Sequence, residues 1–374
     1  VKRDASDVHF EPEANFLRIR YRIDGMLRQI RALHKSYWPA MAVRIKVLSG
    51  MNIAETRAPQ DGRINLTMSG RQVDFRVAAQ PTIHGENVVL RILDRQKGIV
   101  PLEGLGLAED HLDQLKLMIA RPEGIILVTG PTGSGKTTTL YSVLNHINSE
   151  GINIMTLEDP VEYPMALVRQ TSVSESAKLD FANGIRSMMR QDPDAILVGE
   201  IRDQDTAEMA FRAAMTGHQV YSTLHTNSAI GAVPRLLDIG ILPDIMAGNI
   251  IGVVAQRLIR KLCVHCKTPY QAESGELRLL GIASETPRPV IYRPCGCERC
   301  DFQGYRGRLA IMELLRINGD MDELIARRAT AREMRKLAHD MGFRSLADDG
   351  LRRVLDGSTS IEELGRVVDL TDRM

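Results

Sequence analysis

Apolar and polar residues alternate in short runs through the first hundred residues of the chain. Residues 16–24 (FLRIRYRID) have the two-residue period of a half-buried strand, and Asp24-Gly25 is typical of a hairpin turn. A helix-like stretch (WPAMAVRIKVLSGM) and three strand-like runs (GRINLTM, RQVDFRVAA and NVVLRILD) follow. These elements predict a small α+β domain over residues 1–96. The Gly- and Pro-containing stretch after it predicts a linker over residues 97–104.

From residue 105 to residue 262 the pattern changes to apolar runs that end in polar residues. Four such runs are GIILVTG, NIMTLED, DAILVGE and QVYSTLHT. Continuous apolar runs of this length are typical of parallel strands buried on both faces and joined by helices, which predicts an α/β domain. Polar residues that follow such strands meet at one edge of the sheet, so we expect the functional site there. The helix after the third run is expected to begin with Asp205 as its N-cap and to end at Gly217.

The last third of the chain begins with a cysteine-containing segment over residues 263–304. Residues 305–374 then show apolar side chains spaced by three and four positions, as in TAREMRKLAHDMG and SIEELGRVV. This spacing is typical of amphipathic helices. We therefore predict a helical C-terminal region over residues 305–374.

Composition narrows the class of protein. A chain of 374 residues is long enough for two or three domains. Its net charge of +1 and its 4% of aromatic residues argue against a nucleic-acid partner. The longest apolar stretches fall far short of the ~20 residues that cross a bilayer. The chain begins without methionine or a signal peptide, and we expect it to be a fragment whose natural N-terminus is missing.

A phosphate-binding loop is the strongest chemical signal in the sequence. GPTGSGKT follows the apolar run IILVT and precedes TTLYSVLNHI, which is the strand, loop and helix context of a P-loop. Its glycines allow backbone N–H groups to turn toward phosphates, Lys136 is expected to reach the β- and γ-phosphates, and the Thr137 hydroxyl is expected to hold Mg²⁺. The predicted nucleotide-binding residues are Gly130, Pro131, Thr132, Gly133, Ser134, Gly135, Lys136, Thr137 and Thr138.

Carboxylates and histidines near the other apolar runs are the candidates for catalysis. In DAILVGEIRD the strand is followed by Glu200, which is well placed to polarise a water molecule. One such residue alone is more often structural, but several at strand ends favour a common site. The further candidates are Glu158, Asp159 and Glu162 in LEDPVE, and His218 and His225 in TGHQVYSTLHTN.

The five cysteines all lie in one segment. An odd number confined to one region argues against a secreted disulfide framework, so a reducing compartment and hence the cytoplasm are expected. Cys263 and Cys266 form one C-x-x-C pair, and Cys297 and Cys300 form another, which predicts a closed, structural Cys₄ zinc site. Four unrelated reduced thiols or a redox pair are the alternatives. Cys295 fits the site less well, although it could substitute for a ligand.

These motifs together resemble the secretion ATPase superfamily, and within it the assembly motors of type II secretion and of type IV pili. GPTGSGKT is similar to its Walker A motif, TLEDPVEY to its Asp box, RQDPDAILVGEIRD to its Walker B motif and TGHQVYSTLHTN to its His box. ASDVHFEP, RIDGMLR, QDGRI and HGENVVLRILD resemble its N-terminal domain, and GYRGR and MELL its C-terminal part. The resemblance implies a RecA-like P-loop core, a PAS-like N-terminal domain and a zinc finger insertion.

The resemblance also implies roles for individual residues. Glu200 would be the catalytic carboxylate that orients or activates the attacking water, and Glu158 would assist at Mg²⁺ and water. His225 would sense the γ-phosphate. Arg63 in QDGRI and Arg76 in DFRV match arginines that the family's N-terminal domain directs at the phosphates.

The implied function is a cytoplasmic hexameric ATPase that powers assembly of a pseudopilus in type II secretion, with type IV pilus assembly as the alternative. A pilus retraction motor, a nucleic-acid motor and a nucleotide-gated scaffold without hydrolysis are less favoured; by resemblance, assembly motors commonly carry the cysteine finger and retraction motors lack it. Inner-membrane platform and recruiting proteins are the implied partners. The basic stretch RLIRKLCVHCK makes acidic phospholipid a further candidate. The stretch GRLAIMELL departs from the family's GRTGIYELL, which blurs the subfamily.

Overall fold

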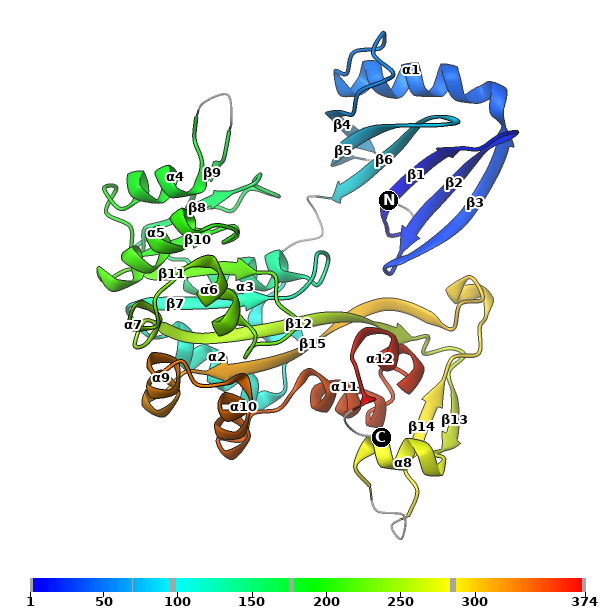
Figure 1. Ribbon diagram of the computed structural model, residues 1–374. Coiled ribbons are helices and arrows are strands. Elements are labelled where there is room, and N and C mark those ends of the chain that lie inside the picture. Colours follow the sequence, from blue (N-terminus) through cyan, green and yellow to red (C-terminus); the bar gives the residue numbers. More distant parts are fainter. Residues whose placement is uncertain (1–2, 69, 95–98, 175–177, 283–286, 372–374) are drawn as a thin grey trace. The chain divides into compact units, whose positions relative to one another are not determined.

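The computed structural model describes residues 3–68, 70–94, 99–174, 178–282 and 287–371. The chain divides into two compact units, Val1–Gly98 and Ile99–Met374 (Figure 1). The predicted linker over residues 97–104 begins on residues outside the described part. The finer boundaries at residues 262 and 304 lie inside the second unit and stay predictions.

In the described part of the smaller unit, a six-stranded antiparallel sheet packs with one α-helix. The strand order is β3-β2-β1-β6-β5-β4. Helix α1 (Trp38–Ser49) packs on one face of this sheet, where Leu17, Val77 and Val88 are buried. The predicted hairpin turn is confirmed, because Asp24 and Gly25 both have positive φ angles between β2 and β3. The strands are β1 Ala5–Pro12, β2 Phe16–Ile23, β3 Met26–His34, β4 Gln60–Met68, β5 Arg71–Thr82 and β6 Gly85–Asp94.

The larger unit is built on a seven-stranded sheet of order β15-β12-β7-β11-β10-β8-β9. All neighbouring strands pair in parallel except β15, which is antiparallel to β12. The four predicted apolar runs form β7, β8, β10 and β11, so the predicted α/β class is confirmed. The strands are β7 Gly124–Thr129, β8 Ile154–Glu158, β9 Val168–Ser172, β10 Ala195–Val198, β11 Gln219–Leu224, β12 Ile250–Leu262 and β15 Tyr305–Arg316.

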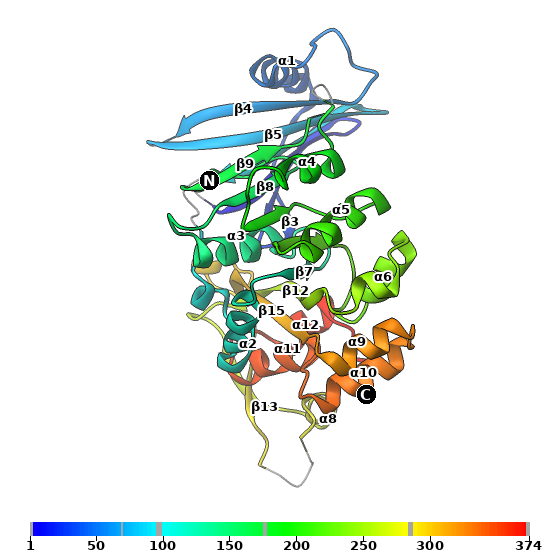
Figure 2. The same cartoon turned by 90° about the vertical axis from the view of Figure 1, so that its left-hand side faces the viewer.

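Helices cover both faces of this sheet, as the continuous apolar runs require (Figure 2). On β7, Ile126 and Val128 belong to the core beneath α2 (Glu109–Ile119) and α3 (Lys136–Ile147). Ile125 and Leu127 alternate with them and belong to the core on the opposite face. The helices of that face are α4 Phe181–Met188, α5 Gln204–Met215, α6 Ala232–Ile239, α7 Pro243–Met246, α9 Gly319–Ala326 and α10 Ala331–Asp340.

The N-cap of α5 is Asp203, and the expectation for Asp205 was wrong. The Asp203 side chain accepts a hydrogen bond from the Thr206 N–H at 2.8 Å. Asp205 lies inside the first turn, where its negative charge still suits the positive end of the helix. Two aspartates two residues apart give the same local signal, and the backbone conformation selects between them.

Residues 305–316 form strand β15, so the prediction that residues 305–374 are helical was wrong for this part. β15 pairs with β12 from Gly252 opposite Arg316 to Leu262 opposite Tyr305. An apolar run such as AIMELL fits a helix or a strand by composition, and here the exposed edge of β12 provides the partner that decides it. The helices predicted after β15 are present, and α11 (Leu346–Leu355) and α12 (Ile361–Val367) complete them.

The cysteine-containing segment lies between β12 and β15 and projects from them (Figure 1). It contains β13 (Thr268–Gln271), α8 (Ser274–Leu280) and β14 (Val290–Arg293). A third apolar core joins this segment to α11 and α12. Three short 3₁₀ turns complete the secondary structure of the described residues, at Lys35–Tyr37, Leu102–Leu105 and Glu298–Cys300. No helix among the described residues is long and apolar enough to cross a membrane.

Candidate active site

The carboxyl ends of four neighbouring parallel strands bring most of the predicted site residues to one edge of the sheet. The P-loop follows β7, Glu200 follows β10, His225 follows β11, and Glu158 is the last residue of β8. His218 precedes β11 and therefore lies at the opposite edge, where its Nδ1 contacts the Ala213 carbonyl oxygen at 3.0 Å. The expectation that both histidines share the site holds for His225 alone.

The loop between β7 and α3 has the backbone that its glycines predict. Gly130, Gly133 and Gly135 have φ angles of 150°, 79° and 92°. A side chain at position 130 would place its Cβ 2.5 Å from the Ser134 Oγ and 2.6 Å from the Gln256 carbonyl oxygen. Glycine at this position is therefore required by space as well as by φ.

Lys136 and Ser134 are the side chains of the loop that are suited to bind an anion. The Lys136 ammonium donates to the carbonyl oxygens of Gly130 at 2.9 Å and of Pro131 at 3.2 Å. Burial lowers the pKa of Lys136, with Glu200 acting against this shift and Arg257 adding to it. The Ser134 Oγ is buried and has no hydrogen-bond partner among the described residues. A buried, unpaired hydroxyl beside a cation fits a phosphate-binding loop.

Glu200 and His225 lie together beside this loop. The His225 Nε2 is 3.4 Å from the Glu200 Oε2, and Arg202 forms an ion pair with the other carboxylate oxygen. The Glu200 side chain is only 14% exposed, whereas that of His225 is 45% exposed. A half-buried carboxylate held between a cation and an imidazole is well suited to orient a water molecule. Sequence reasoning missed Arg202, although it lies in the Walker B stretch.

Glu158 lies in a different environment from Glu200. Glu158 is 4% exposed, and its carboxylate accepts hydrogen bonds from the Tyr141 hydroxyl at 2.5 Å, the Thr156 hydroxyl at 2.6 Å and the Gln170 amide at 3.3 Å. Burial raises the pKa of Glu158, and these three donors act against that shift. The donors connect the end of β8 to α3 and β9, so Glu158 contacts the P-loop helix through Tyr141.

Arg63 and Arg76 lie side by side in the smaller unit. They are direct partners across the β4–β5 pair and therefore point to the same face of the sheet. The next residues on each strand, Ile64 and Val77, are buried against α1, so the two arginines point away from the helix. Arg63 is exposed. Two adjacent guanidinium groups on one face suit a polyanionic ligand, and their action on bound phosphates stays a prediction.

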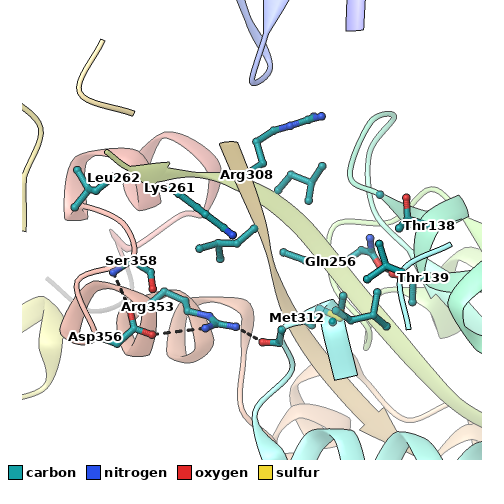
Figure 3. Close-up of a pocket in the computed structure, with 18 of the residues that line it drawn as sticks. Thr138, Thr139, Gln256, Lys261, Leu262, Arg308, Met312, Arg353, Asp356 and Ser358 are labelled. Carbon is teal, nitrogen blue, oxygen red and sulfur yellow. Dashed lines mark hydrogen bonds and ion pairs between the residues drawn. The ribbon is translucent and has the colours of Figure 1, made fainter. Parts of the chain in front are cut away.

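A cavity of about 430 Å³ adjoins the P-loop helix (Figure 3). Thr138 and Thr139 line it on one side, and Lys261 and Arg308 come from the two long strands β12 and β15. Arg353 of α11 lies at its floor, where it donates to the Gly106 carbonyl oxygen. A cavity of this size with cations near its rim is large enough for a small charged ligand.

Gln256 is a site residue that sequence reasoning missed. Its side-chain amide donates to the Ser134 carbonyl oxygen at 2.6 Å, and its Oε1 accepts from the Thr139 hydroxyl at 2.7 Å. Gln256 is 1% exposed, so β12 holds the P-loop from inside the fold. The available signal was a polar pair, Gln256 and Arg257, between the apolar residues IIGVVA and LI.

Four cysteines form a compact cluster at the ends of β12 and β15. The sulfur atoms of Cys263, Cys266, Cys297 and Cys300 all lie within 4.8 Å of one another. The Cys263 to Cys297, Cys266 to Cys300 and Cys297 to Cys300 distances are 3.9, 3.8 and 3.8 Å. Zn–S bonds of about 2.3 Å place tetrahedral sulfurs about 3.8 Å apart. The sulfurs therefore fit a tetrahedral metal ion, and Cys295 is exposed and outside this group.

Backbone N–H groups donate hydrogen bonds to two sulfur atoms of the cluster. The Gly296 N–H donates to the Cys266 sulfur at 3.3 Å, and the Gly304 N–H donates to the Cys300 sulfur at 3.2 Å. Burial would raise the pKa of Cys300, but the amides of Cys297 and Gly304 and the thiols of Cys297 and Cys266 bring it down to about 6. Burial raises the pKa of Cys266, and the Gly296 amide acts against this shift. Thiolates oriented by such donors are the form that binds metal.

A P-loop, an acidic residue and a histidine at one edge of a largely parallel sheet define a P-loop nucleotide-binding α/β protein. The family model described as "Type II/IV secretion system protein" matches residues 1–366, and the chain belongs to this family.

Curated relatives extend the similarity over nearly the whole chain. The type II secretion system protein E of Pseudomonas aeruginosa is 47% identical over 98% of this chain and 73% of its own length. The type II secretion system ATPase E of Vibrio cholerae is 46% identical with the same coverage. The type IV pilus assembly ATPase PilB of Thermus thermophilus is 43% identical over 98% of this chain and 42% of its own length.

Solved structures share the fold. A crystal structure of the pilus retraction motor PilT with bound ADP has a TM-score of 0.64 at 26% identity and covers 100% of this chain and 96% of PilT. The ATPase DotB of Legionella pneumophila has a TM-score of 0.72 at 21% identity, covering 98% of this chain and 92% of DotB. The likeness to DotB concerns the fold alone.

Proposed function

We propose that this chain is the ATPase of a type II secretion machine, in which ATP hydrolysis drives assembly of a pseudopilus. The observation that carries the catalytic part is the placement of Glu200, 3.4 Å from His225, beside the P-loop. The identity of 47% to a protein named for type II secretion supports the choice of machine. In this proposal ATP is the substrate, and water is the second reactant.

In this proposal, different residues of the chain bind the phosphates, hold Mg²⁺ and orient the attacking water. Lys136 and the loop amides bind the β- and γ-phosphates, and the exposed Thr137 hydroxyl holds Mg²⁺, which neutralises charge when bound. Glu200 orients the attacking water and accepts its proton, with Arg202 and His225 fixing the carboxylate. Glu158 assists from the neighbouring strand. Because its carboxylate is held by Tyr141, its contribution passes through the P-loop helix.

Arg63 and Arg76 supply positive charge from the smaller unit. Arginines directed at a transferring phosphoryl group are worth roughly a thousandfold or more in rate. Two of them on one sheet face would link the chemistry to movement of that unit. In a hexameric ring this link turns hydrolysis into mechanical work, which is the motor activity that we propose.

Type IV pilus assembly is the second candidate, because the 43% identity to PilB is close to the 47% for the secretion protein. The cysteine cluster favours either assembly motor over a retraction motor. Inner-membrane platform and recruiting proteins are the proposed partners, and they would hold the cytoplasmic motor at the membrane. Recovery of platform proteins with the affinity-tagged full-length chain from cells would separate the two machines, and recovery of neither set would contradict the proposed location.

Contact with acidic phospholipid stays a prediction. Most cations of the basic stretch RLIRKLCVHCK are buried or already have partners, so the structure gives it little support. The basic stretch lies mainly on β12, where Arg257 is buried and Arg260 pairs with Glu363 at 2.7 Å. Lys267 donates to the Gly357 carbonyl oxygen at 2.8 Å, which leaves Lys261 as the exposed cation of the stretch. Equal co-sedimentation with neutral and anionic liposomes would remove the idea.

The metal of the cysteine cluster is proposed to be zinc with a structural role. Four thiolates saturate a tetrahedral ion and leave no position for water or substrate. The proposed site joins the chain before β13 to the chain before β15 and so closes the finger at its base.

The catalytic assignment is tested by Glu200→Gln. This variant should lose phosphate release by at least about a hundredfold, because the amide cannot accept the proton, while ATP binding stays within about threefold. Glu208→Gln is the matched control, since Glu208 is an exposed carboxylate on α5 that bonds only to Gln204 among the described residues. An unchanged rate for Glu200→Gln would overturn the catalytic role, and absence of hydrolysis by the wild-type hexamer would overturn the proposed activity.

A further inference from the structure

Two successive residues of β12 hold the two loops of the site. Side chains of successive strand residues point to opposite faces, so Gln256 and Arg257 reach different neighbours. Gln256 binds the P-loop at Ser134. Arg257 binds the loop that carries His225, which runs over residues 225–229 and is called the His225 loop below.

The guanidinium of Arg257 fixes the middle of the His225 loop. Its Nη2 donates to the Asn227 carbonyl oxygen at 2.9 Å and to the Asn227 Oδ1 at 3.2 Å. Its Nη1 donates to the Gln256 carbonyl oxygen at 3.0 Å. Arg257 is 8% exposed, so water competes little for these bonds.

Glu313 of β15 fixes the end of the same loop. It lies opposite Ala255 in the β12–β15 pair and is 4% exposed. One carboxylate oxygen accepts from the Ala229 N–H at 2.6 Å, and the other accepts from the Leu346 N–H at 2.9 Å. Glu313 therefore ties the His225 loop to the first residue of α11.

A third contact limits how the His225 loop can move. The Thr226 N–H donates to the Thr129 hydroxyl at 2.9 Å, next to the P-loop. Residues 226, 227 and 229 are held after His225, and β11 ends directly before it, so the chain is fixed on both sides of His225. Small displacements of such groups are costly, because a shift of about 1 Å can change a rate a hundredfold.

The buried charges of Arg257 and Glu313 cost folding free energy. Burial lowers the pKa of Arg257 and raises that of Glu313, which reflects the cost of keeping each group charged. Apolar residues of similar volume often stabilise a core better than buried ions do. The contacts made by Arg257 and Glu313 nevertheless converge on one short loop, the loop that carries His225.

We propose that Arg257 and Glu313 are positioning residues that hold His225 against Glu200 and so act on hydrolysis through the His225 loop. The inference rests on the proposed ATPase activity. Neither residue needs to touch the nucleotide for this role.

The first test compares three variants of the full hexamer. Arg257→Met removes the hydrogen bonds but keeps an apolar stem, Arg257→Lys keeps the charge without the fork, and Glu313→Gln leaves an acceptor for only one of the two N–H groups. Each should lower kcat about tenfold or more and change the Kd for ADP less than threefold. Hydrogen exchange should increase in residues 225–229 but not in residues 130–137.

Arg260→Met is the matched control. Arg260 lies on the same strand and pairs with the buried Glu363 at 2.7 Å, away from the His225 loop. Arg260→Met should lower the free energy of unfolding. It should not lower kcat selectively while the Kd for ADP stays nearly unchanged. If Arg257→Met does not fold, Arg257→Lys carries the test. An unchanged kcat in the folded Arg257 variants, or equal effects in Arg260→Met, would overturn the proposal.

A double-mutant cycle distinguishes positioning from general damage. In a His225→Ala background, Arg257→Lys should have little further effect on kcat, because the group that it positions is gone. Fully additive effects would show that Arg257 does not act through His225. These outcomes differ from failure of the proposed function, which would appear as no ATP hydrolysis by the wild-type hexamer or no effect of Glu200→Gln.

Discussion

At the scale of single residues, the two acidic candidates have the same sequence signal and different surroundings. Glu158 and Glu200 both come at the end of a buried apolar run. Glu158 is enclosed by three hydrogen-bond donors, whereas Glu200 faces Arg202 and His225 at the open edge. The sequence could identify both carboxylates but could not separate their environments, because those depend on which strands become neighbours.

The buried state of Glu158 predicts a pH dependence of stability. Its pKa is raised in the fold, so its contribution to stability is fully present below the ordinary value of about 4.3 and is lost as pH rises through the raised value. Glu158→Gln cannot ionise. The free energy of unfolding of this variant should therefore improve relative to wild type as pH rises from about 4 to 8, when measured by urea denaturation.

Glu208→Gln is again the control, since Glu208 is exposed on α5. If the difference between Glu158→Gln and wild type instead decreased with rising pH, the three donors would outweigh burial. The pKa of Glu158 in the folded protein would then lie below its ordinary value.

At the scale of elements, β12 connects the P-loop, the His225 loop and the cysteine cluster. Its middle residues bind both loops, and its last residue, Leu262, directly precedes Cys263. The two-residue alternation of β15 was hidden in the sequence by apolar residues on both faces. A strand whose second half is buried on both faces cannot be told from a helix by its sequence pattern until its partner strand is known.

The cysteine cluster predicts a metal content that depends on four thiols and not on the fifth. Cys297→Ser should reduce bound zinc from about one ion per chain to nearly none, because one of four ligands is lost. Elemental analysis of the purified protein measures this directly. Hydrogen exchange should also increase at residues 258–262, where β12 ends beside the cluster.

Cys295→Ser is the matched control, because Cys295 is exposed and outside the cluster. It should keep its zinc and its exchange pattern. Absence of zinc from the wild-type protein would contradict the metal assignment, and loss of zinc on Cys295→Ser would show that this residue is a ligand.

At the scale of the whole molecule, the predicted phosphate-directed arginines belong to a different unit from the P-loop. Arg63 and Arg76 lie in Val1–Gly98, and Lys136 and Glu200 lie in Ile99–Met374. In a closed ring, a site of this kind can be completed within one subunit or by a neighbouring subunit. Mixing experiments distinguish these arrangements.

Arg63→Ala and Glu200→Gln proteins should each be nearly inactive alone. If Arg63 acts between subunits, an equimolar mixed ring should regain activity, because about a quarter of its interfaces then combine an intact Arg63 with an intact Glu200. The measurement is steady-state phosphate release after mixing and reassembly. No recovery would place Arg63 in its own subunit's site, and full activity of Arg63→Ala alone would remove it from catalysis.

Sequence pattern was sufficient to predict the local features of this protein: the strand-like runs and the hairpin turn of the smaller unit, the parallel strands of the larger one, the P-loop and the two cysteine pairs. Each depends on side-chain periodicity, turn chemistry or short spacing, which act within a few residues. The tertiary structure alone decided that residues 305–316 form a strand, that His225 meets Glu200, and that Gln256, Arg257 and Glu313 hold the two loops. Those features join residues that lie far apart in the chain, such as Gln256 and Ser134, which are 122 positions apart. Only the order of strands in the folded sheet brings such residues together.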